Sequence, residues 1–352
     1  MSAPIHKVQE WKRSLYEMII DVRAPSEFEL DHIPGAVNMP VLTDSERIEV
    51  GTIYKQISPF EARKVGAAYV SQNISLHLRN KLSNKGNNFK PLIYCWRGGQ
   101  RSSAFNRILS EIGWQSYQLA GGYKTYRRDV LRELEIYSSK LDLVVVGGYT
   151  GAGKTKLLNE LRSKGEQIID LEKLANHRGS LLGEVQHSSQ PSQKAFESRI
   201  LEAIKQLSNS RKTFIEAESS TIGNLLLPPP LWKKLKSAPI VWVDVPLKSR
   251  VDFLLKEYIQ LTDNPSKLKD LLKLIKRRED RELFELISNN IEKHEWGLVA
   301  SNLLSGHYDP AYKKSIKRSG ELKIFEIYQS DCSDTSITFS AEKIISNFKK
   351  MS

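Results

Sequence analysis

Length, composition and charge narrow the classes of protein to which this chain can belong. It has 352 residues, of which 40% are hydrophobic, and this is enough for two domains of ordinary size. Its Gly and Pro contents are ordinary and it contains 6 Trp, which argues against a disordered chain. The formal net charge of +12 favours a polyanionic partner, nucleic acid before an anionic membrane surface, and the alternative is a basic chain without such a partner.

The two cysteines, Cys95 and Cys332, are too few for a disulfide framework and lie in no metal-ligand spacing. Cys332 has acidic neighbours that disfavour its thiolate, so we expect it to be unreactive. The N-terminal residues lack the apolar core of a signal peptide, and no stretch approaches the ~18 apolar residues of a membrane span. We therefore expect a cytoplasmic protein with free thiols and no membrane association.

Residues 1–137 form the first expected domain. Apolar strands are expected at 16–22, 91–95 and 115–119. A helix follows the second strand, because apolar side chains recur there at helical spacing from Ala104 to Ile112. Alternation of strands and helices of this kind predicts a parallel α/β sheet.

Residues 141–352 form the second expected domain, after a polar boundary at 138–140. Its buried strands are expected at 141–146, 167–170, 213–217 and 240–245. Beyond them the pattern predicts basic amphipathic helices, roughly over 251–260 and 266–290. The fold class expected for the whole chain is α/β, with a parallel-sheet domain followed by a P-loop NTPase-like domain whose C-terminal part is helical and basic.

The strongest motif follows the strand at 141–146. Residues 148–155 match the pattern G-x-x-x-x-G-K-[ST], and a helix is expected directly after them. In this pattern the glycines let backbone N–H groups converge on a phosphate, the Lys adds charge and the Thr reaches a Mg²⁺ ion. The residues assigned to phosphate binding are Gly148, Gly151, Ala152, Gly153, Lys154 and Thr155.

The phosphate compound itself is left open by these residues. Asp170 and Glu216 each end an expected strand, so they are candidates to orient Mg²⁺ or its water. A solvated or ion-paired carboxylate is the alternative for each of them. No adenine- or guanine-specifying motif accompanies the loop, so the ligand is either a nucleotide or a diphosphate that belongs to no nucleotide.

A second candidate site is the loop after the strand at 91–95. There Cys95 is followed by Arg97, Gly98, Gly99 and Arg101 before a helix begins. Backbone N–H groups, a helix N-terminus and arginine charge favour a reactive thiolate, and they can also hold an oxyanion, a persulfide or a perselenide. We therefore assign these five residues to catalysis, over the alternative of a buried structural cysteine.

Basic residues concentrate in the C-terminal half of the second domain. Those assigned to RNA binding are Arg250, Lys276, Arg277 and Arg278. Basic residues with aromatic neighbours suit a phosphate backbone and unstacked loop bases. A solvated helix face is the alternative for any single side chain, but the net charge of +12 favours a real patch.

The first domain resembles a rhodanese domain. Asp21, Arg23, Glu27 and residues 32–36 (His-Ile-Pro-Gly-Ala) match its N-terminal motif, and the Cys95 loop takes the place of its active-site loop. With the phosphate loop behind it, the chain resembles the tRNA 2-selenouridine synthase family. The segments that carry this second resemblance are 95–99, 121–124, 148–155 and 174–180.

The resemblance to the synthase family implies an activity on tRNA. Such proteins replace the sulfur of 2-thiouridine at the wobble position by selenium from selenophosphate, and they attach a geranyl group to that sulfur from geranyl diphosphate. The implied partners are the Lys, Glu and Gln tRNAs, with a selenophosphate-producing enzyme as a further candidate. The implied roles are selenium handling for Cys95, diphosphate binding for the phosphate loop, and contact with a phosphate or the reacting base for His177 and Arg178. Without the resemblance, that pair would be interpreted as a surface loop.

Two other functions stay open from the residues alone. Five residues separate Cys95 from Arg101, as in phosphatases of related fold, whereas common sulfurtransferase loops have four. The chain could therefore be a nucleotide-hydrolysing, kinase-like enzyme with an appended phosphatase or sulfurtransferase domain. It could also be a non-catalytic RNA-binding module in which Cys95 senses oxidants.

Overall fold

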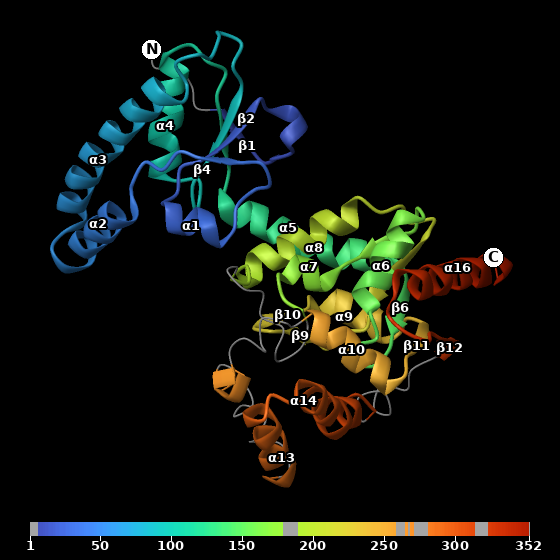
Figure 1. Ribbon diagram of the computed structural model, residues 1–352. Coiled ribbons are helices and arrows are strands. Elements are labelled where there is room, and N and C mark those ends of the chain that lie inside the picture. The colour runs from blue at the N-terminus through green and yellow to red at the C-terminus, as the bar shows by residue number, and fades with distance from the viewer. Residues whose placement is uncertain are drawn as a thin grey trace. The chain divides into compact units, whose positions relative to one another are not determined.

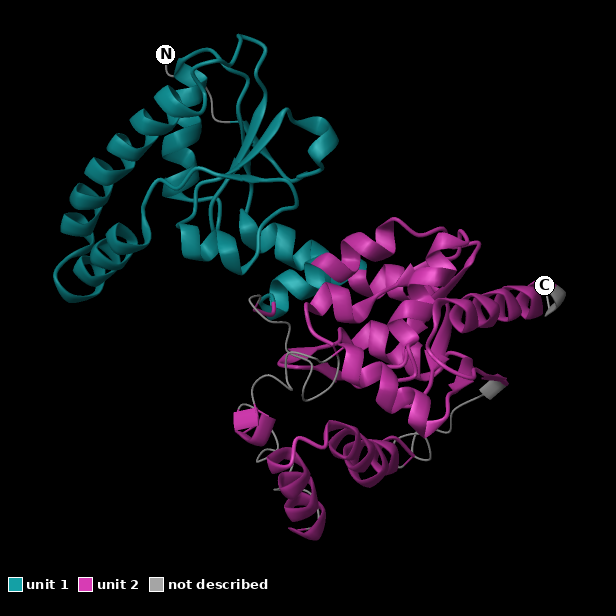
Figure 2. Cartoon of the chain, viewed as in Figure 1, with its two compact units in different colours: residues 1–133, 191–198 teal, residues 134–190, 199–352 magenta. Residues whose placement is uncertain are grey.

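The computed structural model describes residues 6–178, 189–257, 265–266, 268–270, 281–313 and 323–351. The chain divides into two compact units, coloured separately in Figure 2. Unit 1 comprises residues 1–133 and 191–198, and unit 2 comprises residues 134–190 and 199–352. The first division, between residues 133 and 134, falls a little before the expected boundary at 138–140. The expected domains, 1–137 and 141–352, remain a prediction.

Unit 1 is built on a parallel sheet with the strand order β1-β5-β4-β2-β3. Its strands are β1 (His6–Val8), β2 (Met18–Asp21), β3 (Val37–Asn38), β4 (Pro91–Tyr94) and β5 (Tyr117–Leu119). The central strands β2 and β4 are almost entirely buried, as parallel strands are when helices cover both faces of a sheet. The three strands expected in this part of the sequence are therefore confirmed, each with shorter ends.

Helices accompany the strands of unit 1 in the chain. They are α1 (Pro25–Leu30), α2 (Asp44–Gln56), α3 (Pro59–Asn80), α4 (Gln100–Glu111) and α5 (Tyr123–Lys140), of which α5 continues into unit 2. The Thr43 hydroxyl accepts a hydrogen bond from the Glu46 N–H, and Ser58 followed by Pro59 starts the next helix. Because only a short turn separates α2 from α3, the two lie side by side (Figure 1), a pair that the sequence analysis did not anticipate.

Unit 2 is built on a second parallel sheet, with the order β12-β11-β6-β8-β7. Its strands are β6 (Asp142–Gly147), β7 (Gln167–Ile169), β8 (Lys212–Glu216), β11 (Ile240–Asp244) and β12 (Lys323–Tyr328). A short antiparallel pair, β9 (Thr221–Ile222) and β10 (Leu225–Leu226), lies apart from it. The four strands expected here are confirmed, whereas β12 was not foreseen. The strand β6 lies at the centre, so the loop that follows it is flanked by the carboxyl ends of β8 and β11.

Helices complete unit 2. They are α6 (Lys154–Ser163), α7 (Leu171–Ala175), α8 (Gln193–Lys205, shared with unit 1), α9 (Pro229–Lys236), α10 (Leu247–Glu257), α13 (Arg281–Glu292), α14 (Trp296–Leu303) and α16 (Asp334–Met351). The core forms where Leu157 and Leu161 of α6 pack with Val144 of β6 and Ile344 of α16. The basic helices expected at 251–260 and 266–290 correspond in part to α10 and α13, and residues 258–260, 267 and 271–280 of these ranges lie outside the described part of the chain. Among the described helices, none is long and apolar enough to cross a bilayer.

Candidate functional site

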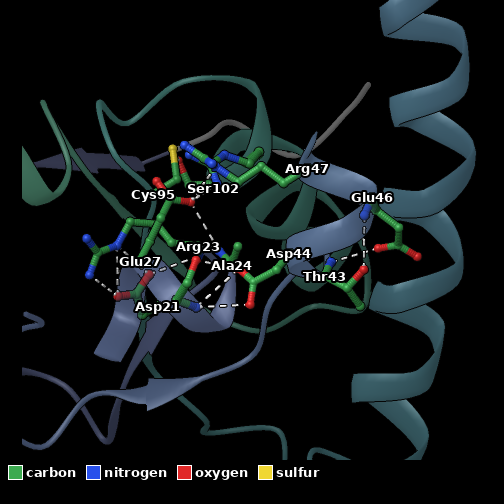
Figure 3. Close-up of polar contacts among 12 residues, drawn as sticks. Asp21, Arg23, Ala24, Glu27, Thr43, Asp44, Glu46, Arg47, Cys95 and Ser102 are labelled. Carbon is green, nitrogen blue, oxygen red and sulfur yellow. Dashed lines mark hydrogen bonds and ion pairs between the residues drawn. The ribbon is translucent and has the colours of Figure 1, made fainter. Parts of the chain in front are cut away.

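The Cys95 loop lies at the carboxyl end of β4, directly before α4. Cys95 itself is only 4% exposed. Its Sγ accepts a hydrogen bond from the Gly99 N–H at 3.3 Å and lies 3.2 Å from the Ser102 hydroxyl oxygen, beside which it is seen in Figure 3. The Ser102 hydroxyl also donates to the Gly99 carbonyl oxygen at 3.2 Å. The loop therefore directs one backbone N–H at the sulfur, and such a hydrogen bond is stronger when the acceptor carries a negative charge.

The start of α5 holds this loop in place from behind. The Tyr123 N–H donates to the Cys95 carbonyl oxygen at 2.8 Å, and the Lys124 N–H donates to the Trp96 carbonyl oxygen at 3.2 Å. Gly122 has a φ of +58°, and a Cβ atom added there would collide with the Cys95 carbonyl oxygen. Residues 121–124, singled out in the sequence through the family resemblance, therefore fix the backbone of the cysteine loop.

The two arginines of the loop lie in different surroundings. Arg101 Nη1 donates to Glu27 Oε2 at 2.7 Å, and Arg47 Nε lies 3.1 Å from the same oxygen. Burial alone would raise the pKa of Glu27, but the hydrogen bond and charge of Arg101 hold this pKa below its ordinary value. Arg97 is exposed. The loop therefore has one exposed guanidinium, that of Arg97, and one, that of Arg101, which a partly buried carboxylate orients.

Sequence reasoning missed Arg47 as a member of this group. It comes from α2, far along the chain from the cysteine loop, and no local motif marks it. Figure 3 shows its side chain reaching back toward the region of Cys95. The signal that could have pointed to it is Glu27, which the resemblance had singled out and which binds both Arg47 and Arg101.

The phosphate loop connects β6 to α6, as the sequence predicts. Gly151 and Gly153 have φ values of +81° and +73°, a region of backbone conformation that favours glycine. Lys154, the first residue of α6, turns its ammonium back over the loop and donates to the carbonyl oxygens of Gly148 at 3.0 Å and Tyr149 at 3.4 Å. The positive charge and the start of the helix therefore lie at one place, which suits a phosphate.

Carboxylates gather next to Thr155 at the end of this loop. The Thr155 hydroxyl donates to Glu172 Oε2 at 2.8 Å, and the Glu172 N–H donates to Glu216 Oε1 at 2.9 Å. Asp170 caps α7, because its side chain accepts a hydrogen bond from the Lys173 N–H at 2.9 Å. Of the two candidates chosen from the sequence, Glu216 thus lies behind Glu172, and Asp170 is engaged with the backbone.

Sequence reasoning missed Glu172 and Glu218. Burial raises the pKa of Glu172 and raises that of Glu216 well above its ordinary value. Burial, with the nearby Glu172 charge, raises the pKa of Glu218 to about 7. Within the described residues, no group of three or more His, Cys, Asp or Glu side chains is arranged to hold a metal ion. Thr155 and Glu172 nevertheless fit Mg²⁺, which takes one or two protein ligands and fills its other positions with water and phosphate oxygens.

His177 and Arg178 follow directly after α7. His177 is 6% exposed, and its N–H donates to the Glu172 carbonyl oxygen at 3.0 Å. Arg178 Nη1 donates to the Glu257 carbonyl oxygen at 2.7 Å, at the end of α10. His177 is therefore buried beside the segment that carries Glu172, whereas Arg178 is partly exposed and contacts the end of α10. The next residues, 179–188, lie outside the described part of the chain.

The structure changes the interpretation of Arg250. Its guanidinium binds both carboxylate oxygens of Asp309, at 2.9 and 2.8 Å, and donates to the Thr150 carbonyl oxygen of the phosphate loop at 3.2 Å. Arg250 is only 4% exposed, so it supports the phosphate loop and does not present its charge to RNA. The other residues assigned to RNA contact lie outside the described residues: Lys276, Arg277 and Arg278.

Cys332 packs against the same loop. Its Sγ lies 3.5 Å from the Gly151 carbonyl oxygen, and a Cβ atom added to Gly153 would lie 3.2 Å from this sulfur. Burial, followed by the charge of Asp331, raises the pKa of Cys332 to about 11. The thiol is thus neutral at physiological pH, in agreement with the expectation that it is unreactive.

Both parts of the chain match known protein families. Residues 5–129 match the rhodanese-like domain family, and residues 141–274 match the tRNA 2-selenouridine synthase AAA domain. A tRNA 2-selenouridine synthase of Serratia proteamaculans is 32% identical, over 94% of this chain and 96% of that protein. One of Sulfurovum sp. is 32% identical, over 87% and 91%.

A third relative matches a shorter stretch. The tRNA 2-selenouridine synthase of Nitrosomonas europaea is 38% identical over 248 residues, which are 69% of this chain and 64% of that protein. The match therefore spans less than two thirds of the relative's length, although the two matches above extend over almost the whole of both chains. With its rhodanese-like unit, its phosphate loop and these relatives, the chain belongs to the tRNA 2-selenouridine synthase family.

Proposed function

We propose that this protein modifies the wobble uridine of tRNA, converting 2-thiouridine to 2-selenouridine. The observation that carries the proposal is the presence of two separate anion-binding loops in one chain. One is built around the sulfur of Cys95 and the other around the ammonium of Lys154. The relatives named tRNA 2-selenouridine synthase support the choice of substrate.

The phosphate loop serves the first of two steps in this proposal. The thiocarbonyl sulfur of the uridine attacks the first carbon of geranyl diphosphate, the carbon–oxygen bond breaks, diphosphate leaves and the uridine loses its N3 proton. Lys154 and the N–H groups at the start of α6 stabilise the charge that develops on the departing diphosphate. Bound Mg²⁺, next to Thr155 and Glu172, would neutralise further diphosphate charge.

The Cys95 loop serves the second step. The geranylated sulfur is a good leaving group, so the selenium of selenophosphate can add to C2 of the base and expel the geranyl thiol. Water then cleaves the selenium–phosphorus bond, phosphate leaves, and the selenium stays on C2. Cys95, Arg97 and Arg101 are the residues that hold the anionic selenium species in this proposal. Support comes from the N–H donated to the Cys95 sulfur and from the exposed position of Arg97.

One experiment separates the two steps. Purified protein is incubated with 2-thiouridine tRNA, geranyl diphosphate, Mg²⁺ and selenophosphate, and the nucleosides are identified by mass spectrometry. Replacement Cys95→Ser should abolish 2-selenouridine and leave the geranylated nucleoside. The matched control is Cys332→Ser, which removes a thiol that is neutral and packed behind the phosphate loop, and which should leave both products.

Two results would contradict the proposal. Loss of both products in Cys95→Ser, with the fold intact, would refute the division of labour between the loops. Failure of the unmodified protein to change the thiouridine at all, together with rapid hydrolysis of ATP or GTP in the absence of tRNA, would favour a nucleotide-hydrolysing enzyme instead.

A further inference from the structure

Next to the catalytic thiol, unit 1 carries a stack of aromatic and cationic side chains that the proposed chemistry leaves unused. Trp96 follows Cys95 directly, and its indole stacks on the Tyr123 ring, with centroids 5.1 Å apart and planes inclined by 25°. The Arg23 guanidinium lies 4.2 Å from the centre of the same Tyr123 ring. The stack therefore runs from Arg23 through Tyr123 to Trp96.

The inner members of this stack are held by hydrogen bonds. The Tyr123 hydroxyl donates to Asp31 Oδ2 at 2.7 Å, and Arg23 Nη2 donates to Asp21 Oδ2 at 2.6 Å and to the Asp31 carbonyl oxygen at 2.7 Å. Arg23 is 1% exposed and Tyr123 is 2% exposed, whereas Trp96 is only partly buried. Trp96 is thus the one accessible end of a stack whose inner part is already rigid.

A lysine from a distant part of the sequence lies beside this end. The Lys194 ammonium is 5.3 Å from the centre of the Trp96 ring and 5.8 Å from that of Tyr123. Its segment, residues 191–198, belongs to unit 1. It is held there by an ion pair between Arg127 and Glu197 and by a hydrogen bond of 2.9 Å from the Tyr126 hydroxyl to Ser198. The positive charge of Lys194 therefore lies beside the partly exposed ring of Trp96, the residue that directly follows Cys95.

An aromatic face and a cation at its edge are the two elements with which proteins hold an unpaired base: the ring stacks on the base and the cation meets the flanking phosphate. We propose that Trp96 is the stacking platform for the pyrimidine ring of the target uridine, with Lys194 contacting the adjoining phosphodiester. This inference rests on the proposed function.

The geometry of stacking also suits the reaction. A ring stacked on Trp96 keeps its opposite face open, and a nucleophile adds to C2 of a pyrimidine from a face of the ring. Consecutive Cα atoms are about 3.8 Å apart, so the platform cannot move away from Cys95 without moving the loop itself. The hydrogen bonds from Tyr123 and Lys124 to the carbonyl oxygens of Cys95 and Trp96 hold that loop still. In this proposal Trp96 is a positioning residue that orients the base, and the residues of the cysteine loop contact the reacting atoms.

A photochemical experiment tests the platform without relying on turnover. An RNA anticodon stem-loop with 5-iodouridine at the wobble position is bound to the unmodified protein and irradiated, and the crosslinked peptide is sequenced by mass spectrometry. The expected adduct is on Trp96, because iodouracil couples to an aromatic ring stacked on it. Crosslinks confined to other residues would overturn the inference.

Substitutions supply the second readout. Trp96→Ala should raise the KM for a 2-thiouridine stem-loop by roughly 10- to 100-fold while changing kcat little, since stacking of one base is worth this range of affinity. Trp96→Phe keeps an aromatic face, so it should restore KM to within about 10-fold of the unmodified protein. The matched control is Trp114→Phe, in the same unit, where the indole donates to the Gly86 carbonyl oxygen; its KM should not change. Lys194→Gln should reduce the slope of log affinity against log salt by about 1.

Failure of the inference and failure of the proposed function look different in these experiments. If the unmodified protein forms 2-selenouridine and a folded Trp96→Ala variant keeps its KM, the platform is refuted and the function stands. If iodouridine couples to Trp96 but no thiouridine is converted, the base is held as inferred and the proposed function is refuted. Should Trp96→Ala fail to fold, the crosslink to the unmodified protein and the KM of Trp96→Phe decide the question.

Discussion

The Cys95 loop and the phosphate loop occupy equivalent places in two parallel sheets, yet they bind anions by different means. Each follows the carboxyl end of a buried strand and precedes a helix, β4 and α4 in one unit and β6 and α6 in the other. In unit 1 a buried cysteine sulfur accepts a hydrogen bond from a backbone N–H, and a carboxylate, Glu27, orients an arginine. In unit 2 glycine backbone and Lys154 form the cradle, and carboxylates gather near Thr155.

This difference indicates how one strand–loop–helix geometry supports two kinds of chemistry. A cysteine at the end of the strand places a nucleophile where a helix N-terminus stabilises negative charge. Glycines in the same place leave room for a whole phosphate group, whose oxygens the N–H groups then meet directly. We therefore expect substitutions in one loop to spare the chemistry of the other, and the predictions below test this independence.

The largest effect is expected for Lys154→Ala. Removing a charge that stabilises the departing diphosphate should slow geranylation by about 10²- to 10³-fold. Lys156→Ala is the matched control: it removes the same charge from the same helix, but Lys156 lies over the Phe253 ring and not over the loop. Rates of formation of the geranylated nucleoside check the prediction, and equal losses in both variants would show that overall charge, not position, matters.

Gly122→Ala should damage unit 1 through its backbone. The glycine has a φ of +58°, and an added Cβ would collide with the Cys95 carbonyl oxygen and come within 2.6 Å of the Gly98 nitrogen. We expect the free energy of unfolding to fall by about 2–4 kcal/mol. Gly113→Ala, where φ is +100° but nothing lies within 4 Å of the added atom, should cost only about 1–2 kcal/mol. Equal costs in denaturant melts would show that the contact with Cys95 does not constrain the loop.

Glu27→Gln tests the carboxylate that orients Arg101. The side chain of Glu27 is 11% exposed and binds both Arg101 and Arg47, so loss of its charge should lower the free energy of unfolding by about 1.5–3 kcal/mol. Glu61→Gln breaks an exposed pair with Lys64 and should cost less than about 0.5 kcal/mol. Chemical denaturation of the two variants checks the difference, and a cost for Glu27→Gln as small as that of the control would refute the role of the carboxylate.

The dependence of stability on pH should differ in sign between the loops. The pKa of Glu27 is lowered, so its contribution to stability is present above the ordinary carboxyl pKa and is lost as pH falls through the lowered value. The pKa of Glu218 is raised from 4.5 to about 7, so the folded state favours its neutral form and is penalised as pH rises through this window. Between pH 4.5 and about 7, the free energy of unfolding of the unmodified protein should fall relative to that of Glu218→Gln. Denaturant melts at several pH values measure this difference. A difference between the two proteins that does not vary with pH would contradict the assignment.

Much of the fold could be predicted because its signals are local. Apolar runs bounded by turns located β2, β4, β6 and β8, and glycine spacing located the phosphate loop, since each depends on residues adjacent in the chain. The strand β12 and the helices α2 and α3 were not predicted. The partner of β12 is β11, which is distant in the sequence, and the two helices carry no chemical motif.

The candidate sites could be predicted only in part, for the same reason. Cys95 and Lys154 are marked by their immediate neighbours in the sequence. Glu172, Arg47 and Lys194 are not, because each reaches its site from another element of the fold. Arg250 is the opposite case, a residue that the sequence assigned to the wrong role. Its place in a basic stretch predicted a contact with RNA, but its buried guanidinium binds Asp309.

The sequence by itself determined the two parallel-sheet units, the positions of both loops and the family resemblance, since the conformation of a strand, turn or helix start depends on residues within a few positions of it. Only the tertiary structure decided which side chains accompany each loop: Glu27 with Arg47 beside Arg101, Glu172 beside Thr155, and Lys194 beside Trp96. Such groupings are a property of packing, because burial and charge pairing bring together residues that no short pattern in the chain connects.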